Sequence, residues 1–245
     1  MLYYLYDGSF EGLLTAVYEA YYRGDRLQGI VCRQNLQYNL LDEYIMIDTD
    51  EVKSDKVYRS IYEKISWEAL QHVYHVFLAE APDAGTLIYN YLRLGWKMGN
   101  KVDLHLSDDR VLGIHTISQR VEYERHKLMG FVRFRQVEGG IFYAPVEPDN
   151  NIVELLAPHF AERLADQNWI IHDVKRELAA LYNKKDWVIA DFNVGELPAI
   201  TQEESEYQNL WKEFFNTLAI PSRINPKLQK QLMPRRYWKH LTEKW

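Results

Sequence analysis

The chain has 245 residues, of which 47% are hydrophobic and 26% charged, with a formal net charge of −6 at pH 7. These values are typical of an ordinary globular protein with a sizeable core, in one large domain or two modest ones. No run of about 18 apolar residues occurs, so no membrane span is expected. The single Cys32 excludes an intramolecular disulfide and a cysteine-based metal cage. The first residues, MLYYLYDGSF, lack a basic region ahead of an apolar segment, so no signal peptide and a cytoplasmic location are expected.

The N-terminal half is predicted to be mainly helical, with a few short strands. A strand is expected at 2–6, and Ser9 can cap the helix that follows. The buried face of that helix is predicted from 3,4-spacing to contain Phe10, Leu13, Leu14, Val17, Tyr18 and Tyr21. Two strand-like runs occur at 29–32 and 43–47. Further helices are predicted at about 55–65, 67–80, 84–98 and 108–127.

The pair His72 and His75 raises the question of a metal site. Both histidines lie on one predicted helix, but no third ligand lies nearby in the sequence. We interpret them as ordinary helix-surface residues and expect neither a metal nor a cofactor. The chain also lacks the motifs of ATP-binding loops, dinucleotide-binding folds, serine hydrolases and zinc proteases.

The central stretch contains the densest polar motif, HKLMGFVRF at 126–134. It is predicted to be a helix end, a break at Gly130 and a strand over 131–135. On that strand Phe131, Arg133 and Arg135 would share one face, because side chains alternate. Gly139 and Gly140 indicate a hairpin to a second strand at 141–146.

The remaining central elements complete the predicted sheet. A helix is expected at about 151–166, a strand at 169–173, a short helix at 177–182 and a last strand at 186–192. Together they predict an antiparallel sheet of about four strands with helix cover, and the fold class is therefore α+β. We expect three segments, 1–128, 129–193 and 194–245, that form one compact unit.

Polar residues attached to these core elements are the candidates for catalysis, and they are Glu124, His126, His159, His172 and Asp173. A histidine base needs an orienting partner. Asp173 would serve His172 poorly, because adjacent strand residues face opposite sides. We predict that His159, Arg163, His172 and Arg176 lie in one neighbourhood. That neighbourhood is either a ligand pocket or a buried polar network that ties helix to sheet.

The C-terminal segment is basic. A strong amphipathic helix is predicted at 203–218, with an apolar stripe of the kind that usually packs into a core. From Lys212 to Lys244, eight Lys or Arg and two Glu give a net charge of +6 in an acidic chain. This asymmetry predicts either a surface that binds a polyanion or a basic tail docked on the acidic body. The predicted nucleic-acid-binding residues are Arg133, Arg163, Arg176, Arg223, Lys227, Lys230, Arg235, Arg236, Tyr237, Trp238 and Lys239.

Five separated motifs resemble a known family. They are YDGSFEGLL (6–14), EYERHKLMGFVRF (122–134), HFAER (159–163), WIIHDVKR (169–176) and LWKEFFNTLAIPSRINPKLQKQLMPRRYWKHL (210–241). The chain resembles the bacterial "probable DNA metabolism protein" family, which accompanies a radical-SAM protein of DNA modification or repair. Relatives of its domain are fused to uracil-DNA-glycosylase-like regions. The resemblance implies DNA and a radical-SAM protein as partners.

These observations leave three hypotheses of different classes. The first is a DNA-associated accessory protein that binds nucleic acid through its basic C-terminal segment. The second is an enzyme acting on a nucleotide or nucleic acid, with a histidine or Glu124 as acid or base and arginines on phosphate. The third is a scaffold that binds a partner protein through an aromatic-rich surface.

Overall fold

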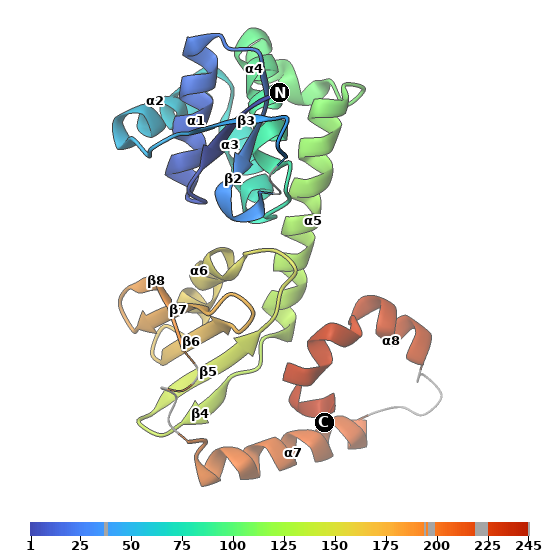
Figure 1. Cartoon of the computed structure of the whole chain (residues 1–245). Helices are drawn as coiled ribbons and strands as arrows, with labels where there is room; N and C mark the ends of the chain where they lie inside the picture. The colour runs from blue at the N-terminus through green and yellow to red at the C-terminus, as the bar shows by residue number, and fades with distance from the viewer. Residues whose placement is uncertain (37–38, 194, 196–198, 219–224, 245) are drawn as a thin grey trace. The chain divides into compact units, whose positions relative to one another are not determined.

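The computed structural model describes residues 1–36, 39–193, 195, 199–218 and 225–244. The chain divides into two compact units, Met1–Tyr123 and Glu124–Trp245, and α5 (Asp109–Phe131) begins in the first and ends in the second. Helices and strands both contribute to each unit, which confirms the broad α+β class (Figure 1). Within the described residues, no helix is long and apolar enough to cross a membrane.

The first unit contains a three-stranded parallel sheet in the order β2-β1-β3. Its strands are β1 (Leu2–Tyr6), β2 (Leu27–Cys32) and β3 (Glu43–Met46). The bounds of β1 are those predicted, and β2 and β3 overlap the two predicted runs. The helix α1 (Phe10–Arg23) joins β1 to β2, and such a crossover is what lets consecutive strands pair in parallel.

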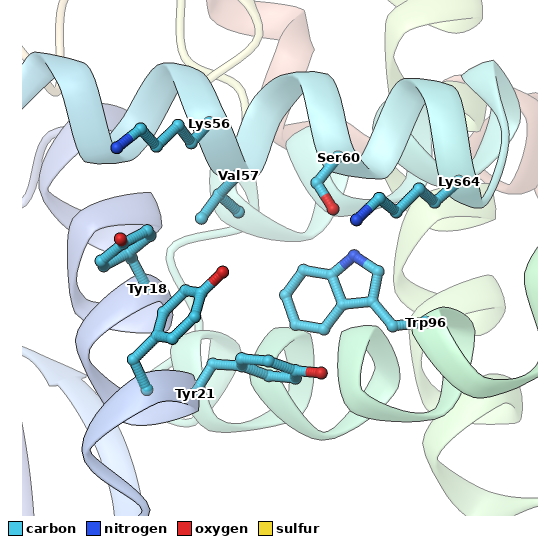
Figure 2. Close-up of a pocket in the computed structure, with 8 residues that line it drawn as sticks. Tyr18, Tyr21, Lys56, Val57, Ser60, Lys64 and Trp96 are labelled. Carbon is cyan, nitrogen blue, oxygen red and sulfur yellow. The ribbon is translucent and has the colours of Figure 1, made fainter.

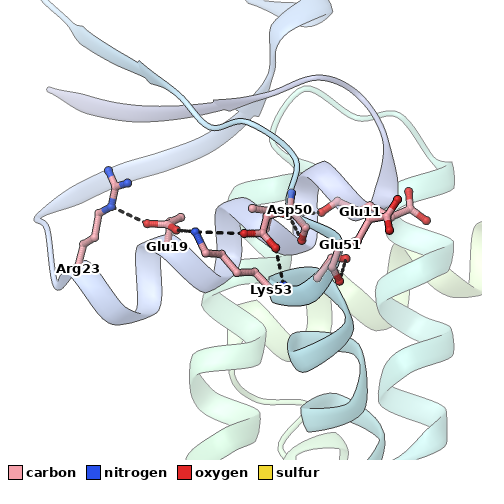
Figure 3. Close-up of polar contacts among 8 residues, drawn as sticks. Glu11, Glu19, Arg23, Asp50, Glu51 and Lys53 are labelled. Atoms are coloured by element: carbon pink, nitrogen blue, oxygen red, sulfur yellow. Dashed lines mark hydrogen bonds and ion pairs between the residues drawn. The ribbon is translucent and has the colours of Figure 1, made fainter.

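The other helices of the first unit are α2 (Glu51–Lys64), α3 (Trp67–Leu78) and α4 (Ala84–Met98), followed by a 3-10 segment, Gly99–Leu104. α4 packs very closely on β2. A Cβ added to Gly85 would lie only 2.6 Å from the carbonyl oxygen of Ile30. A polar network joins α1 to α2 (Figure 3). In it, Lys53 donates to Glu19 at 2.7 Å, and Arg23 donates to the same carboxylate at 2.6 Å.

The second unit contains a five-stranded sheet whose strands follow chain order, β4-β5-β6-β7-β8. The elements are β4 (Arg135–Val137), β5 (Ile141–Val146), α6 (Val153–Arg163), β6 (Asn168–Asp173), β7 (Leu178–Asn183) and β8 (Trp187–Asp191). The predicted hairpin is confirmed. Gly139 and Gly140 both have positive φ, at 86° and 72°, which favours glycine, and β4 pairs antiparallel with β5.

Two predictions about this sheet are wrong. β5 and β6 pair in parallel, because α6 carries the chain back along the sheet before β6 begins. Residues 177–182, predicted as a short helix, belong mainly to strand β7. The alanines and leucines there suit a helix locally. Pairing with β6 on one side and β8 on the other overrides that preference.

The predicted break at Gly130 and the strand over 131–135 are also wrong. α5 continues through Gly130 to Phe131, and β4 begins only at Arg135. Glycine in a helix costs only about 1 kcal/mol relative to alanine, which is too little to end a 23-residue helix. Phe131, Arg133 and Arg135 therefore do not share one face of a strand.

The C-terminal helices are α7 (Gln202–Leu218) and α8 (Pro226–Leu232), followed by 3-10 segments at Arg235–His240 and Thr242–Lys244. α7 confirms the predicted helix, but its apolar stripe is not core. Side chains of the stripe that are between 41% and 66% exposed are Tyr207, Leu210, Trp211, Phe214 and Leu218. A contiguous exposed apolar stripe of this kind is typical of a contact surface.

Candidate functional site

The structure does not bring together the predicted cluster of His159, Arg163, His172 and Arg176. The ring of Trp169 on β6 packs against Phe160 of α6, with centroids 6.5 Å apart. His172 is three residues further along the strand and therefore points to the opposite face of the sheet. There its Nδ1 lies 2.9 Å from the hydroxyl of Tyr143, and its ring meets Phe192 edge-on.

His172 is fully buried, and burial lowers its pKa, so the imidazole is neutral at pH 7. Its Nε2 has no hydrogen-bond partner among the described residues. Arg163 and His126 are exposed, and His159 is half-buried with its ring against Phe160. Among His126, His159, Arg163 and His172, only His172 is buried, and it lies on the sheet face opposite to the one that packs against Phe160.

Asp173 and Arg176 form a structural turn at the end of β6. Asp173 Oδ1 accepts from the backbone N–H of Lys175 and Arg176 at 3.0 and 3.3 Å. Oδ2 pairs with the Arg176 guanidinium at 2.7 Å. The same guanidinium also donates to the carbonyl oxygens of Pro148 and Asp149. Arg176 therefore holds the loop after β5 and is engaged inside its own chain.

Glu124 is the centre of a buried network. Its carboxylate is 4% exposed and accepts from the backbone N–H groups of Asp149 and Asn150 at 2.8 and 3.0 Å. The Asn150 side-chain amide and the Tyr237 hydroxyl each donate to it at 2.6 Å. Burial and Glu124 both raise the pKa of Tyr237, so the phenol keeps its proton and donates. This network ties the end of α5 to the C-terminal segment.

Ion pairs attach the basic C-terminal segment to the acidic body of its own unit. They are Arg236 with Asp149 at 2.7 Å, Lys239 with Glu147, and, with the charges reversed, Arg133 with Glu243 at 2.8 Å. Trp211 of α7 also donates to Glu243 at 3.1 Å. We call this set of contacts, with Tyr237 on Glu124, the C-terminal strap. Its cations are largely neutralised by carboxylates of the same chain.

A few predicted binding residues remain accessible. Lys227, Lys230 and Arg235 are exposed and have no acidic partner in the described part of the chain. Arg235 lies over the half-buried ring of Trp238, with 5.7 Å between the guanidinium carbon and the ring centroid. Arg223 lies outside the described residues.

The first unit contains a pocket that the sequence analysis did not anticipate (Figure 2). Its volume is about 200 Å³, and α1, α2 and α4 contribute the lining residues Tyr18, Tyr21, Tyr22, Lys56, Val57, Ser60, Lys64 and Trp96. Tyr21 was predicted on the buried face of α1, but it is 51% exposed. Its ring meets that of Trp96 at 4.9 Å between centroids. The doublet of adjacent tyrosines at 21–22 is the sequence signal that could have marked this surface.

The charges of this aromatic pocket are not neutralised by its neighbours. Lys56 and Lys64 form no ion pair within the described residues, and Lys56 lies 5.8 Å from the centroid of Tyr18. The buried indole N–H of Trp96 also has no partner there. In Figure 2 the indole nitrogen points toward Ser60 and Lys64. Aromatic faces, two cations and an unpaired donor therefore meet in one small concave surface.

Among the described residues, one group of side chains could hold a metal ion, and it consists of His72, Asp103 and His115. The sequence analysis considered His72 only with His75. Asp103 and His115 lie 31 and 43 residues further along the chain, which is why sequence proximity did not reveal them.

The chain matches the model of a domain family of unknown function, DUF4130, over residues 82–243. It belongs to this family. The matched range includes Trp96, Asp103, His115 and the described strap, whereas Tyr21, Lys56 and His72 precede it. No curated protein matches the chain. Membership therefore identifies an uncharacterised domain family and assigns no activity.

Proposed function

We propose that this protein is a nucleic-acid-associated accessory protein that holds an unpaired base in the aromatic pocket of its first unit. The observation that carries the proposal is the meeting of the Tyr21 and Trp96 rings between Lys56 and Lys64. Base–aromatic stacking contributes about 1–3 kcal/mol per base and tolerates any sequence, because every base has a π-face. The two lysines supply cations for the flanking phosphates.

The size and charge of the pocket favour a single base over a larger ligand or a duplex. Pockets for drug-sized molecules usually measure about 300–1,000 Å³, whereas this one measures about 200 Å³. The net charge of −6 and the C-terminal strap both oppose extensive contact with a duplex backbone. The sequence resemblance supports DNA as the nucleic acid and a radical-SAM protein as the partner enzyme. The enzyme hypothesis needed a convergence of histidines around His172 that the second unit does not provide.

The test is binding of labelled single-stranded and duplex oligonucleotides, followed by fluorescence anisotropy across a salt series. We expect a preference for the single strand. With two lysine–phosphate contacts, the log–log salt slope should be about −1.4. Tyr21→Ala should weaken binding by about tenfold, since one stacking contact is lost. Lys56→Gln with Lys64→Gln should weaken it and remove most of the salt dependence.

Matched variants separate the pocket from the tail. Tyr207→Ala removes an exposed tyrosine elsewhere, and Lys184→Gln with Lys185→Gln removes two exposed charges, so neither should change affinity. Loss of binding only in a Lys227→Gln, Lys230→Gln, Arg235→Gln variant would assign binding to the tail and reject the pocket. A protein that binds no nucleic acid at any salt would favour the scaffold hypothesis, with the α7 stripe as its contact surface.

A further inference from the structure

We propose that His72, Asp103 and His115 form a site for a first-row divalent metal ion, with Zn²⁺ as the best-matched ion. The three side chains come from α3, the 3-10 segment Gly99–Leu104 and α5. All three residues lie in the first unit. The site is independent of the aromatic pocket and of the proposed nucleic-acid binding.

The geometry brings three donors of suitable type together. One ligand atom from each residue lies within 4.8 Å of the others. His115 Nε2 is 2.9 Å from Asp103 Oδ1, and the His72 and His115 rings are 4.4 Å apart between centroids. Ligands at about 2.0–2.2 Å from a tetrahedral Zn²⁺ lie about 3.4 Å from one another. Small side-chain rotations would therefore close the group around one ion.

Neighbouring residues orient these ligands in the way that metal sites require. The Ser118 hydroxyl is 2.9 Å from His72 Nδ1, which leaves Nε2 of that ring for the metal. Tyr91 donates to Asp103 Oδ1 at 2.8 Å. Ser118 and Tyr91 are themselves buried, so both orienting groups are held by the core.

An ordinary hydrogen-bonded pair accounts for only part of the arrangement. A His115–Asp103 contact alone is common on protein surfaces. It does not explain why a second imidazole, His72, packs against the first. Two imidazoles and one carboxylate are a donor set of first-row divalent metals.

The ion expected here keeps an open coordination position. His115 and Asp103 are about one-fifth exposed, so solvent reaches the group. Three protein ligands with access for water are typical of catalytic zinc sites, whereas structural zinc sites close all four positions with protein side chains. Nitrogen and carboxylate ligands also suit Fe²⁺, so the identity of the metal is tested directly.

The experiment uses the full chain after removal of bound metal with a chelator. Calorimetric titration should show one equivalent of Zn²⁺ bound, and Mg²⁺ and Ca²⁺ should not compete. The absorption spectrum with Co²⁺ should show d–d bands of nitrogen and oxygen ligands. Asp103→Asn and His115→Gln should each lower the Zn²⁺ affinity by at least 100-fold. Ser118→Ala, which removes only an orienting group, should lower it by about 10- to 100-fold.

The control is His126→Gln, which removes an exposed histidine of α5 and should leave Zn²⁺ affinity unchanged. Failure of the wild-type protein to bind Zn²⁺ at micromolar concentration would overturn the proposal. Unchanged binding by the Asp103→Asn, His115→Gln double variant would overturn it as well. If circular dichroism shows that this variant is unfolded, the wild-type Co²⁺ spectrum decides, because lack of d–d bands would exclude the site. Tighter binding of Fe²⁺ than of Zn²⁺ would confirm the site and reassign its metal.

Discussion

The two units differ in how they use their polar and aromatic residues. In the second unit, many charged residues of the motifs that dominate the sequence are engaged within the chain. Glu124 accepts from three residues, Arg176 holds a loop, and Arg236 pairs with Asp149. In the first unit, Tyr21, Lys56 and Lys64 face a pocket and are left without ionic partners among the described residues.

This difference shows that the density of charged motifs is a poor guide to a binding surface. Opposite charges close together in a compact domain neutralise one another when the chain brings them into contact. The eight basic residues of the C-terminal segment are neutralised in part, because carboxylates of the loop after β5 pair with Arg236 and Lys239. Sparse residues without partners, such as Lys56, are the better candidates.

The sharpest challenge to the structural role of the second unit is Glu124→Ala. Removing this buried carboxylate leaves two backbone N–H groups, an amide and the Tyr237 hydroxyl without their acceptor. We expect a loss of about 3–5 kcal/mol in the free energy of unfolding. Urea denaturation followed by tryptophan fluorescence measures it. The exposed Glu162→Ala should cost less than about 0.5 kcal/mol, and equal costs would refute the buried network.

A smaller effect isolates the attachment of the strap. Tyr237→Phe keeps the buried ring and removes the 2.6 Å hydrogen bond to Glu124, together with the weaker 3.0 Å bond that the hydroxyl accepts from Arg236. A hydrogen bond to a charged group contributes about 1.5–3 kcal/mol, so stability should fall by about that amount. Limited proteolysis should then cut the C-terminal segment faster. Tyr207→Phe on the exposed stripe is the matched control, and similar losses in both variants would show that the strap is not held at Tyr237.

The smallest effect concerns His172 and pH. Burial lowers its pKa in the folded protein below the unfolded value of about 6.5, so the unfolded chain binds the proton more tightly. Its contribution to stability is therefore complete above about pH 6.5 and is lost as pH falls toward the folded pKa. The slope from one proton is at most about 1.4 kcal/mol per pH unit.

Denaturation at several pH values between 5 and 8 tests this. His172→Gln should flatten the slope below pH 6.5, whereas His126→Gln, at an exposed position, should not. A wild-type slope that survives His172→Gln unchanged would assign the pH dependence to other groups. His240 is one of these, because burial lowers its pKa as well.

Local signals in the sequence were sufficient for most elements. The strand at Leu2–Tyr6, the hairpin at Gly139–Gly140 and the helix α7 follow from alternation, turn chemistry and 3.6-residue periodicity. The sequence also showed which polar residue types occur at the candidate positions of the second unit. It did not show their roles, because a role depends on which partner the fold supplies.

The remaining features depend on tertiary structure, because they arise from pairing and packing between segments that are far apart in the sequence. β7 is a strand because β6 and β8 offer backbone partners on both sides, which outweighs the helical preference of its alanines. Tyr21 and Trp96 line one pocket, and His72, Asp103 and His115 form one group, because packing brings separate helices together. The sequence determined what each segment could form, and pairing and packing between distant segments determined which side chains meet.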